Sequence, residues 1–257
     1  TYSITTGPSA FNHIEFNDMG GSSATWEITD TLDINGTLKL VDGTLDVTSS
    51  NFTVEVEGNW VNQTNATFTA QNGTVIFDGM GSSSTILSDS DPFFNIELND
   101  GGGVASTWEM QDDLNVNGTL KITDGTLDVS ASNFDINVGG NWVNTADGGF
   151  SAQTGTVIFD GNDAITSAGK SFFNVQIGTT ISGGTLTALD DLSIDGTLVA
   201  GSFGTTVLDV TGITLTMSGT TWDMTQLDTF TATNSTVIFD GTTNLTSNGK
   251  SFFNVQL

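Results

Sequence analysis

The sequence predicts an all-β protein whose chain winds into a parallel β-helix, a β-solenoid with coils of about 20 residues and about twelve coils in all. Three observations support this fold class. Strand-like segments recur at steps of about 20 residues, the segments alternate apolar with polar residues, and a longer repeat of about 80 residues is superimposed on them. Each return of the chain would stack one more coil on the last and bury the apolar residues in a shared interior.

The longer repeat is clearest in a strand-and-turn motif that occurs three times. The motif reads Gly-Thr-Val-Ile-Phe-Asp-Gly at 73–79 and 155–161, and it returns without its first glycine at 236–241. A β-branched and aromatic run closed by Asp-Gly is typical of a strand that ends in a tight turn, because glycine accepts positive φ. A Phe-containing strand recurs with the same period, since Phe11, Phe93, Phe172 and Phe252 lie 82, 79 and 80 positions apart.

The repeat predicts how the chain is organised. We expect a single continuous solenoid over residues 1–257, with repeats at about 11–92, 93–171 and 172–251 and the start of a fourth at 252–257. Each large repeat is then expected to form four coils. The competing fold is a string of tandem β-sandwich modules, which the turn signals also fit. The solenoid is favoured because the recurrence of strands about every 20 residues continues across the repeat boundaries without a linker.

Within the segments, alternation is strict enough to assign strands. Residues 134–138, Phe-Asp-Ile-Asn-Val, are one example. A period of two with one apolar face indicates half-buried strands. No stretch shows a period of 3.6 residues, and glycine, threonine and asparagine are too dense for stable helices.

The composition excludes several classes of partner. Acidic residues outnumber basic ones 30 to 4, which gives a net charge of −26. Such a charge repels phosphate backbones and anionic headgroups, so neither nucleic acid nor a membrane surface is an expected partner. No apolar run is long enough to insert into a membrane. Charged residues make up only 13% of the chain, and the neutral, hydroxyl-rich remainder indicates a secreted protein of the extracellular cell surface.

Asp-Gly and Asn-Gly steps recur throughout the chain, and they have two interpretations. Corner geometry is the favoured one, because Asp and Asn tolerate the left-handed region and glycine completes the turn. Calcium binding is the alternative, since carboxylates and turn carbonyls supply hard oxygen ligands. The calcium candidates are Asp78, Asp160 and Asp240, which end the three copies of the strand motif. No calcium-binding spacing of a known type accompanies them, and we expect no other cofactor.

Two pairs of adjacent acids, Asp112-Asp113 and Asp190-Asp191, are the nearest approach to a catalytic motif. Two carboxyl groups that flank a glycosidic bond are the catalytic groups of a glycoside hydrolase, and a parallel β-helix can present such a pair. A catalytic site is normally singular, however, whereas this pair repeats and precedes a strand in the manner of a turn. No catalytic residue is therefore assigned, and the protein is not expected to be an enzyme.

The single histidine and the tryptophans also follow the repeat. His13 occupies the position of Asn95 and Asn174 in the later repeats, which indicates a substituted turn or strand residue rather than a metal ligand or general base. The tryptophans recur with the repeat at Trp26 and Trp108, and separately at Trp60, Trp142 and Trp222. Recurrent tryptophans predict packing units, with a sugar-stacking platform as the alternative.

Four motifs together suggest a known class of protein. They are the Phe-Asn strands, the Asn-Gly-Thr-Leu turns at 35–38 and 117–120, the Gly-Asn-Trp corners at 58–60 and 140–142, and the Gly-Thr-Val-Ile-Phe-Asp-Gly closure. The whole chain resembles the Asn-, Gly- and Thr-rich repeats of large secreted β-solenoid proteins on prokaryotic surfaces, such as adhesin stalks and fibre or sheath components. The resemblance implies an architecture and carries over no site residue.

The expected function follows from this architecture. We expect an extracellular structural protein, a stalk, spacer or filament or sheath subunit of the cell surface. Because both ends of the sequence fall within the repeat pattern, we expect either end-to-end self-association or a longer polypeptide context. The alternatives are an adhesin, a glycan-binding or ice-binding module and, less favoured, a carbohydrate-active enzyme.

Overall fold

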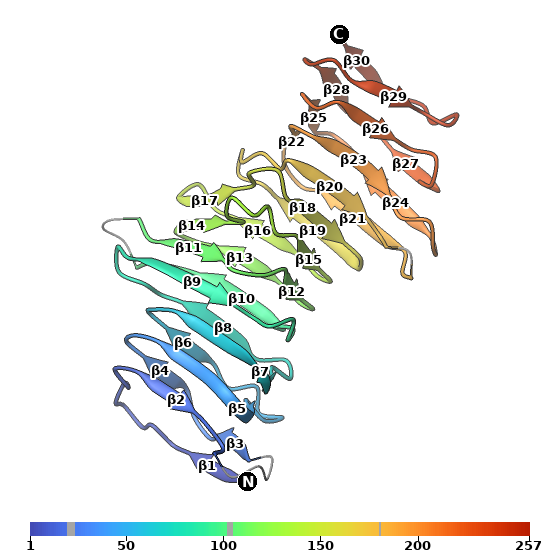
Figure 1. Cartoon of the computed structure of the whole chain (residues 1–257). Helices are drawn as coiled ribbons and strands as arrows, with labels where there is room; N and C mark the ends of the chain where they lie inside the picture. The colour runs from blue at the N-terminus through green and yellow to red at the C-terminus, as the bar shows by residue number, and fades with distance from the viewer. Residues whose placement is uncertain (20–23, 102–104, 180) are drawn as a thin grey trace. The chain divides into compact units, whose positions relative to one another are not determined.

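The structure, a computed structural model, describes residues 1–19, 24–101, 105–179 and 181–257. These residues form strands and turns, and the strand pairs between them are parallel. The chain divides into two compact units, unit 1 with residues 1–130 and 147–151 and unit 2 with residues 131–146 and 152–257. Within each unit, strands of successive turns lie side by side (Figure 1). The parallel β-solenoid is confirmed, with about 11 turns, and the antiparallel sandwich alternative is wrong.

Unit 1 contains two sheets. The first has the order β1 (Tyr2–Ile4), β3 (Thr25–Ile28), β5 (Leu38–Asp46), β7 (Trp60–Thr69), β9 (Ser83–Leu87), β11 (Thr107–Met110), β14 (Gly125–Asp128) and β17 (Gly148–Ser151), with β2 (Ile14–Phe16) paired to β5. The second runs through β4 (Leu32–Ile34), β6 (Val54–Val56), β8 (Thr74–Phe77), β10 (Asn95–Leu98) and β13 (Leu120–Ile122). The short strand β12 (Leu114–Val116) receives an isolated bridge from Phe93.

Unit 2 contains three sheets. One has the order β16 (Trp142–Asn144), β19 (Asn162–Thr166), β21 (Gly184–Ala188), β24 (Thr206–Asp209) and β27 (Thr229–Thr231). A second runs through β15 (Ile136–Val138), β18 (Thr156–Phe159), β20 (Asn174–Ile177), β23 (Thr197–Ala200), β26 (Thr221–Asp223) and β29 (Asn244–Thr246). The third has β22 (Leu192–Ile194), β25 (Thr214–Met217), β28 (Thr236–Phe239) and β30 (Asn254–Gln256). In the described part of the chain, no helix has the length and apolar character that a membrane crossing requires.

The predicted alternation places one side chain in two inside the solenoid. In β6, Val54 and Val56 are fully buried while Glu55 between them is partly exposed. Val54 stacks in register on Val75, and Val75 stacks on Ile96 in the next turn, so the interior of unit 1 carries aliphatic ladders. Burial of such side chains contributes about 1.5–3 kcal/mol each and is the main stabilising contribution to the fold.

An aromatic cluster occupies the interior of each unit. In unit 1, Trp60 lies with ring centroids 4.7 Å from Phe68 and 5.1 Å from Phe93. In unit 2, Trp222 lies 5.6 Å from Phe230 and 5.5 Å from Phe252. Four of the five tryptophans are at most 1% exposed, namely Trp60, Trp108, Trp142 and Trp222. The packing interpretation is therefore confirmed for these four tryptophans, which offer no sugar platform.

The turns are slightly longer than the sequence suggested. Leu32, Val54, Val75 and Ile96 stack in register on successive turns of unit 1 and are 22, 21 and 21 positions apart. A repeat of about 80 residues therefore spans about three and two-thirds turns instead of the expected four.

This mismatch moves equivalent residues onto different faces of the solenoid. Leu38 and Leu120 are equivalent in the repeat, yet Leu38 lies in the sheet of β5 and β7 and Leu120 lies in the sheet of β8 and β10. In unit 2, Trp142 and Trp222 are equivalent and likewise belong to different sheets. A sequence motif consequently does not build a uniform stripe along one face.

Candidate functional site

A groove of about 320 Å³ opens at a corner of unit 1. Its floor is formed by Gly36 and Gly58, which lie on successive turns where the Gly58 N–H donates to the Gly36 carbonyl at 3.1 Å. A Cβ atom on Gly58 would come within 2.7 Å of the Gly36 backbone. The close stacking therefore requires glycine, because a side chain on Gly58 would collide with the backbone of the preceding turn.

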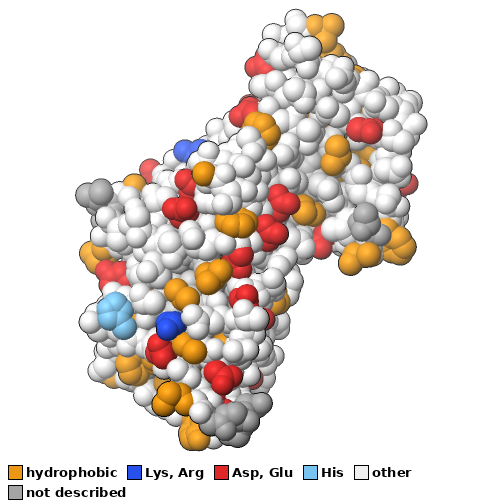
Figure 2. Space-filling model, in the orientation of Figure 1, with side chains coloured by type: hydrophobic (Ala, Val, Ile, Leu, Met, Phe, Trp, Pro, Cys, Tyr) orange, Lys and Arg blue, Asp and Glu red, His pale blue; other side chains and the backbone are white. Residues whose placement is uncertain are grey.

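His13 forms one wall of the groove, just before β2. Its Nδ1 accepts a hydrogen bond from the Thr37 N–H at 2.8 Å, which leaves the Nε2–H side of the ring for other contacts. Asn95 Oδ1 accepts the corresponding bond from Thr119 at 2.9 Å in the second repeat. His13 thus performs the turn role predicted from its equivalence with asparagine. The single histidine is exposed, and Figure 2 shows it in pale blue at the surface.

The opposite wall comes from the next two turns. Asn59 Oδ1 accepts a hydrogen bond from the Thr85 N–H at 2.8 Å, so its amide nitrogen can serve as a donor to the groove. The partly exposed Glu57 supplies a carboxylate, and Met80, 76% exposed, supplies an apolar surface. Ser82 and Ser83 add two hydroxyl groups, whereas Ser84, at the edge of the groove, is only 4% exposed. The groove therefore combines hydrogen-bond donors, acceptors and one apolar patch.

The paired acids are structural acceptors. Asp190 Oδ1 and Oδ2 accept hydrogen bonds from the N–H groups of Ser167 and Ala168, both at 2.7 Å. Asp112 accepts from the Ser88 N–H at 2.9 Å and from the Ser88 hydroxyl at 3.0 Å. Each of these carboxylates holds the turn of the preceding coil, as the turn interpretation predicted.

The first repeat uses the same device. Asp30, the equivalent of Asp112 and Asp190, accepts hydrogen bonds from the N–H groups of Thr6 at 2.9 Å and Gly7 at 2.7 Å. These bonds hold the pKa of Asp30 below its ordinary value, because they stabilise the ionised carboxylate. The acid pair therefore belongs to the turn chemistry of the solenoid.

We predict that Asp190→Ala lowers the free energy of unfolding by about 2 kcal/mol, because two turn N–H groups lose a charged acceptor. Chemical denaturation of the variant and the wild type would measure the change. The exposed Asp195 provides a matched control, and Asp195→Ala is expected to change stability by less than about 0.5 kcal/mol. Equal effects of the two substitutions would contradict the assigned role of Asp190.

The three calcium candidates have different surroundings. Asp78 is partly buried, and burial, reinforced by the nearby Glu55 and Asp33, raises its pKa to about 6. Asp160 accepts a hydrogen bond from the Asn137 amide at 3.2 Å, and Asp240 is exposed. Across the described residues, no group of three or more His, Cys, Asp or Glu side chains is placed to hold a metal ion.

Chelation provides a direct test of the calcium hypothesis. We expect EDTA to leave the melting temperature unchanged, because the described residues place no cluster of ligands around a cation. If the folded state did bind an ion, its removal by EDTA would lower the melting temperature. Thermal unfolding with EDTA, with added Ca²⁺ and with neither would show this. A melting temperature that rises with Ca²⁺ and falls with EDTA would establish calcium binding, and substitution of Asp78, Asp160 or Asp240 would then locate it.

Sequence reasoning missed a buried acid, Asp163. It points inward from β19, is 2% exposed, and has a pKa raised to about 7 by burial. Its Oδ2 accepts a hydrogen bond from the Gly161 N–H at 3.1 Å, while Oδ1 has no partner. The signal was available, because Asp163 stands at the inward position of an alternating strand where the other repeats have Ser84 and Thr243.

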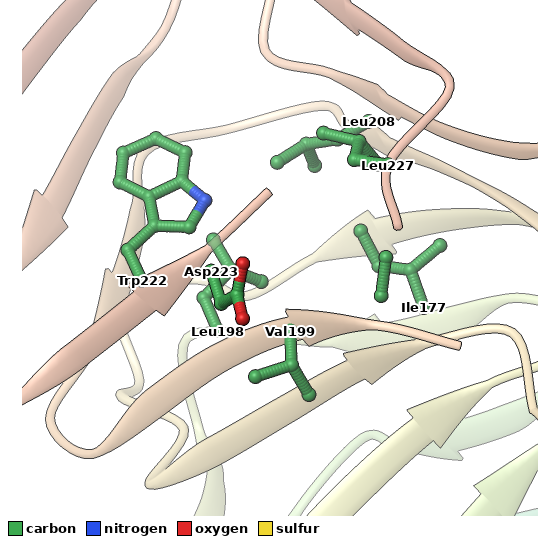
Figure 3. A pocket seen from close by; sticks show the side chains of 8 residues that line it. Ile177, Leu198, Val199, Leu208, Trp222, Asp223 and Leu227 are labelled. Atoms are coloured by element: carbon green, nitrogen blue, oxygen red, sulfur yellow. The ribbon is translucent and has the colours of Figure 1, made fainter. Parts of the chain in front are cut away.

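A second space, in unit 2, is an interior packing gap. Figure 3 shows Trp222, Leu208 and Leu227 around it, with Asp223 among the residues that line it. The space has no room for a water molecule. It therefore offers no ligand site, whereas the groove at His13 has room for a small ligand.

Three comparisons were made with known proteins. The chain gave no match to protein-family models, to curated proteins or to solved structures.

Proposed function

We propose that this chain is a secreted structural protein of the extracellular cell surface, a stalk, spacer or filament or sheath subunit without enzymatic activity. The observation that carries the proposal is that its polar side chains form hydrogen bonds that hold neighbouring coils together. The acid pairs hold turns, His13 replaces a turn asparagine, and four tryptophans fill the interior. A chain whose acidic, imidazole and indole side chains all stabilise contacts between successive coils is suited to a mechanical role.

The mismatch between repeat and turn also supports this role. Equivalent residues lie on different faces, so threonine pairs such as Thr214 and Thr216 do not continue as one flat array. Ice binding through a regular hydroxyl face is therefore disfavoured. Parallel backbone ladders that pair every coil with the next suit an extended spacer, either within a longer polypeptide or through end-to-end association of copies.

Imaging and pulling experiments test the proposal. Negative-stain microscopy of the chain at increasing concentration should show end-to-end filaments if the copies associate. Single-molecule pulling should show unfolding in steps of one or a few coils, because each coil is stabilised mainly by its contacts with the two neighbouring coils. A monomer that does not associate and that unfolds at low force in one step would overturn the mechanical role.

A binding module is the second candidate, and a specific observation favours it. The groove at His13 gathers a carboxylate, an amide, hydroxyl groups and a thioether in one space. Such mixed polar and apolar lining is typical of small-ligand sites. The adhesin or glycan-binding alternative therefore depends on this groove and not on the four buried tryptophans.

A further inference from the structure

The repeat supplies an internal reference for the groove at His13, because each lining residue has counterparts elsewhere in the chain. Positions that only maintain the solenoid are expected to be similar in all repeats. A position that departs from its counterparts carries a chemical group that the common structural role does not require.

The first departure is His13. The second and third repeats have Asn95 and Asn174 at this position, and both accept the same turn N–H bond, at 2.9 and 3.0 Å. An asparagine would serve the turn equally well. The imidazole adds a ring and an N–H donor beyond what the turn needs.

The second departure is Glu57. Its counterparts are Gly139 in the second repeat and Ser218 in the third, because the carbonyl oxygens of all three residues face the glycine that closes the strand motif one turn later. Glu57 therefore places a carboxylate at a corner where the second repeat has no side chain and the third has only a short hydroxyl side chain. The carboxylate lines the groove.

The third departure is an insertion. From Asp78 to Ile86 the chain advances eight positions, whereas from Asp160 to Ile165 it advances five, as it does in the third repeat. The three additional residues are Met80, Gly81 and Ser82, and the Gly81 N–H is held by the Ser106 hydroxyl at 2.9 Å. Met80 and Ser82 both line the groove.

Three independent departures from the repeat thus converge on one groove, although they lie in different turns of unit 1. We propose that the groove is a binding site for a neutral saccharide. The proposal goes beyond the structural function and does not depend on it. The volume of about 320 Å³ is at the lower end of the range of small-ligand pockets and suits one or two sugar rings.

The chemistry of the lining selects this ligand class. A sugar hydroxyl both donates and accepts, which matches the Glu57 carboxylate, the Asn59 amide and the serine hydroxyls. The thioether of Met80 can cover the apolar C–H face of a ring. An anionic ligand is disfavoured by Glu57 and by the net charge of −26. A multivalent cation is disfavoured because one carboxylate and one imidazole are too few charged ligands.

The test uses the repeats of the chain as the source of substitutions. Ligand-observed NMR and calorimetry would measure binding of glucose, galactose, mannose, N-acetylglucosamine and their disaccharides to the wild-type chain. Three variants introduce residues found in other repeats: His13→Asn, Glu57→Gly as in the second repeat, and deletion of 80–82. Because the same residues already fold elsewhere in the chain, circular dichroism and melting temperature should remain close to wild type. We expect at least a tenfold loss of affinity in Glu57→Gly and in the deletion.

A matched control places the same kind of change at an equivalent position. Asn95→His in the second repeat should leave saccharide binding unchanged, as it does not touch the groove. The proposal is overturned if no sugar of the panel binds at millimolar concentration, or if binding survives all three reversals. It is also overturned if Ca²⁺ or Zn²⁺ titration shows a cation held by His13 and Glu57. Filament formation, imaged with the same variants, would report on the structural function separately.

Discussion

Replacing Asp163 with serine is expected to stabilise the protein at pH 8 and to have little effect at pH 4. Burial raises the pKa of Asp163 to about 7 from 3.8, so the folded state holds the proton over a range where the unfolded chain has released it. Stability is therefore lost as the pH rises from about 4 to about 7. The shift corresponds to roughly 4 kcal/mol at pH 8.

The geometry explains why a hydroxyl is the better residue. In the third repeat, the Thr243 hydroxyl donates to the Gly219 carbonyl at 2.6 Å. The equivalent Asp163 Oδ1 and the Gly139 carbonyl oxygen both lie within 2.6 Å of the point where a Cβ on Gly161 would sit. A protonated carboxyl group can donate at this position, whereas the ionised group brings a negative charge toward a carbonyl.

Chemical denaturation of Asp163→Ser and the wild type at pH 4, 6 and 8 would measure this effect. The free energies of unfolding should diverge as the pH rises. Asp78, whose pKa is raised to about 6, adds a pH dependence of the same sign to both proteins, and it cancels in their difference. Asp240→Ser removes an exposed charge and serves as the control. Parallel pH profiles for Asp163→Ser and wild type would show that the buried acid does not destabilise the fold.

The second large effect concerns the aromatic cluster of unit 1. We expect Trp60→Ala to lower the free energy of unfolding by about 3–5 kcal/mol, because it removes a side chain that is 1% exposed and leaves a cavity. Trp60 contacts Phe68 on its own turn, and Phe77 and Phe93 from the segments that follow, with centroids 6.4 and 5.1 Å away. The loss should therefore spread over adjacent coils.

Denaturation and hydrogen exchange would together measure the size and extent of this loss. Amide protons of β5, β7 and β9 should exchange faster in Trp60→Ala, since coils in a solenoid depend on their nearest neighbours. Tyr2→Ala provides the aromatic control, because Tyr2 is 62% exposed. A loss of less than 1 kcal/mol, or exchange confined to β7, would contradict the role of the cluster as a junction between coils.

The candidate site shows how far local sequence reasoning reaches. The equivalence of His13 with Asn95 and Asn174 correctly predicted a turn residue, because that role depends on one N–H group a single coil away. Its proximity to Glu57 and Met80 was not predicted. Those residues come from later turns, and their positions depend on the length of every turn between them.

By itself, the sequence determined the fold class, the strand positions and the inward side chains, because alternation and repeat spacing are local properties of the chain. Only the tertiary structure decided which residues stack upon which. The turn length depends on small irregularities, such as the register shift between Leu40 and Asp42 in the pairing of β5 with β7 and the insertion at 80–82. Because these displacements accumulate from turn to turn, the faces of equivalent residues and the groove at His13 follow from the stacked chain as a whole.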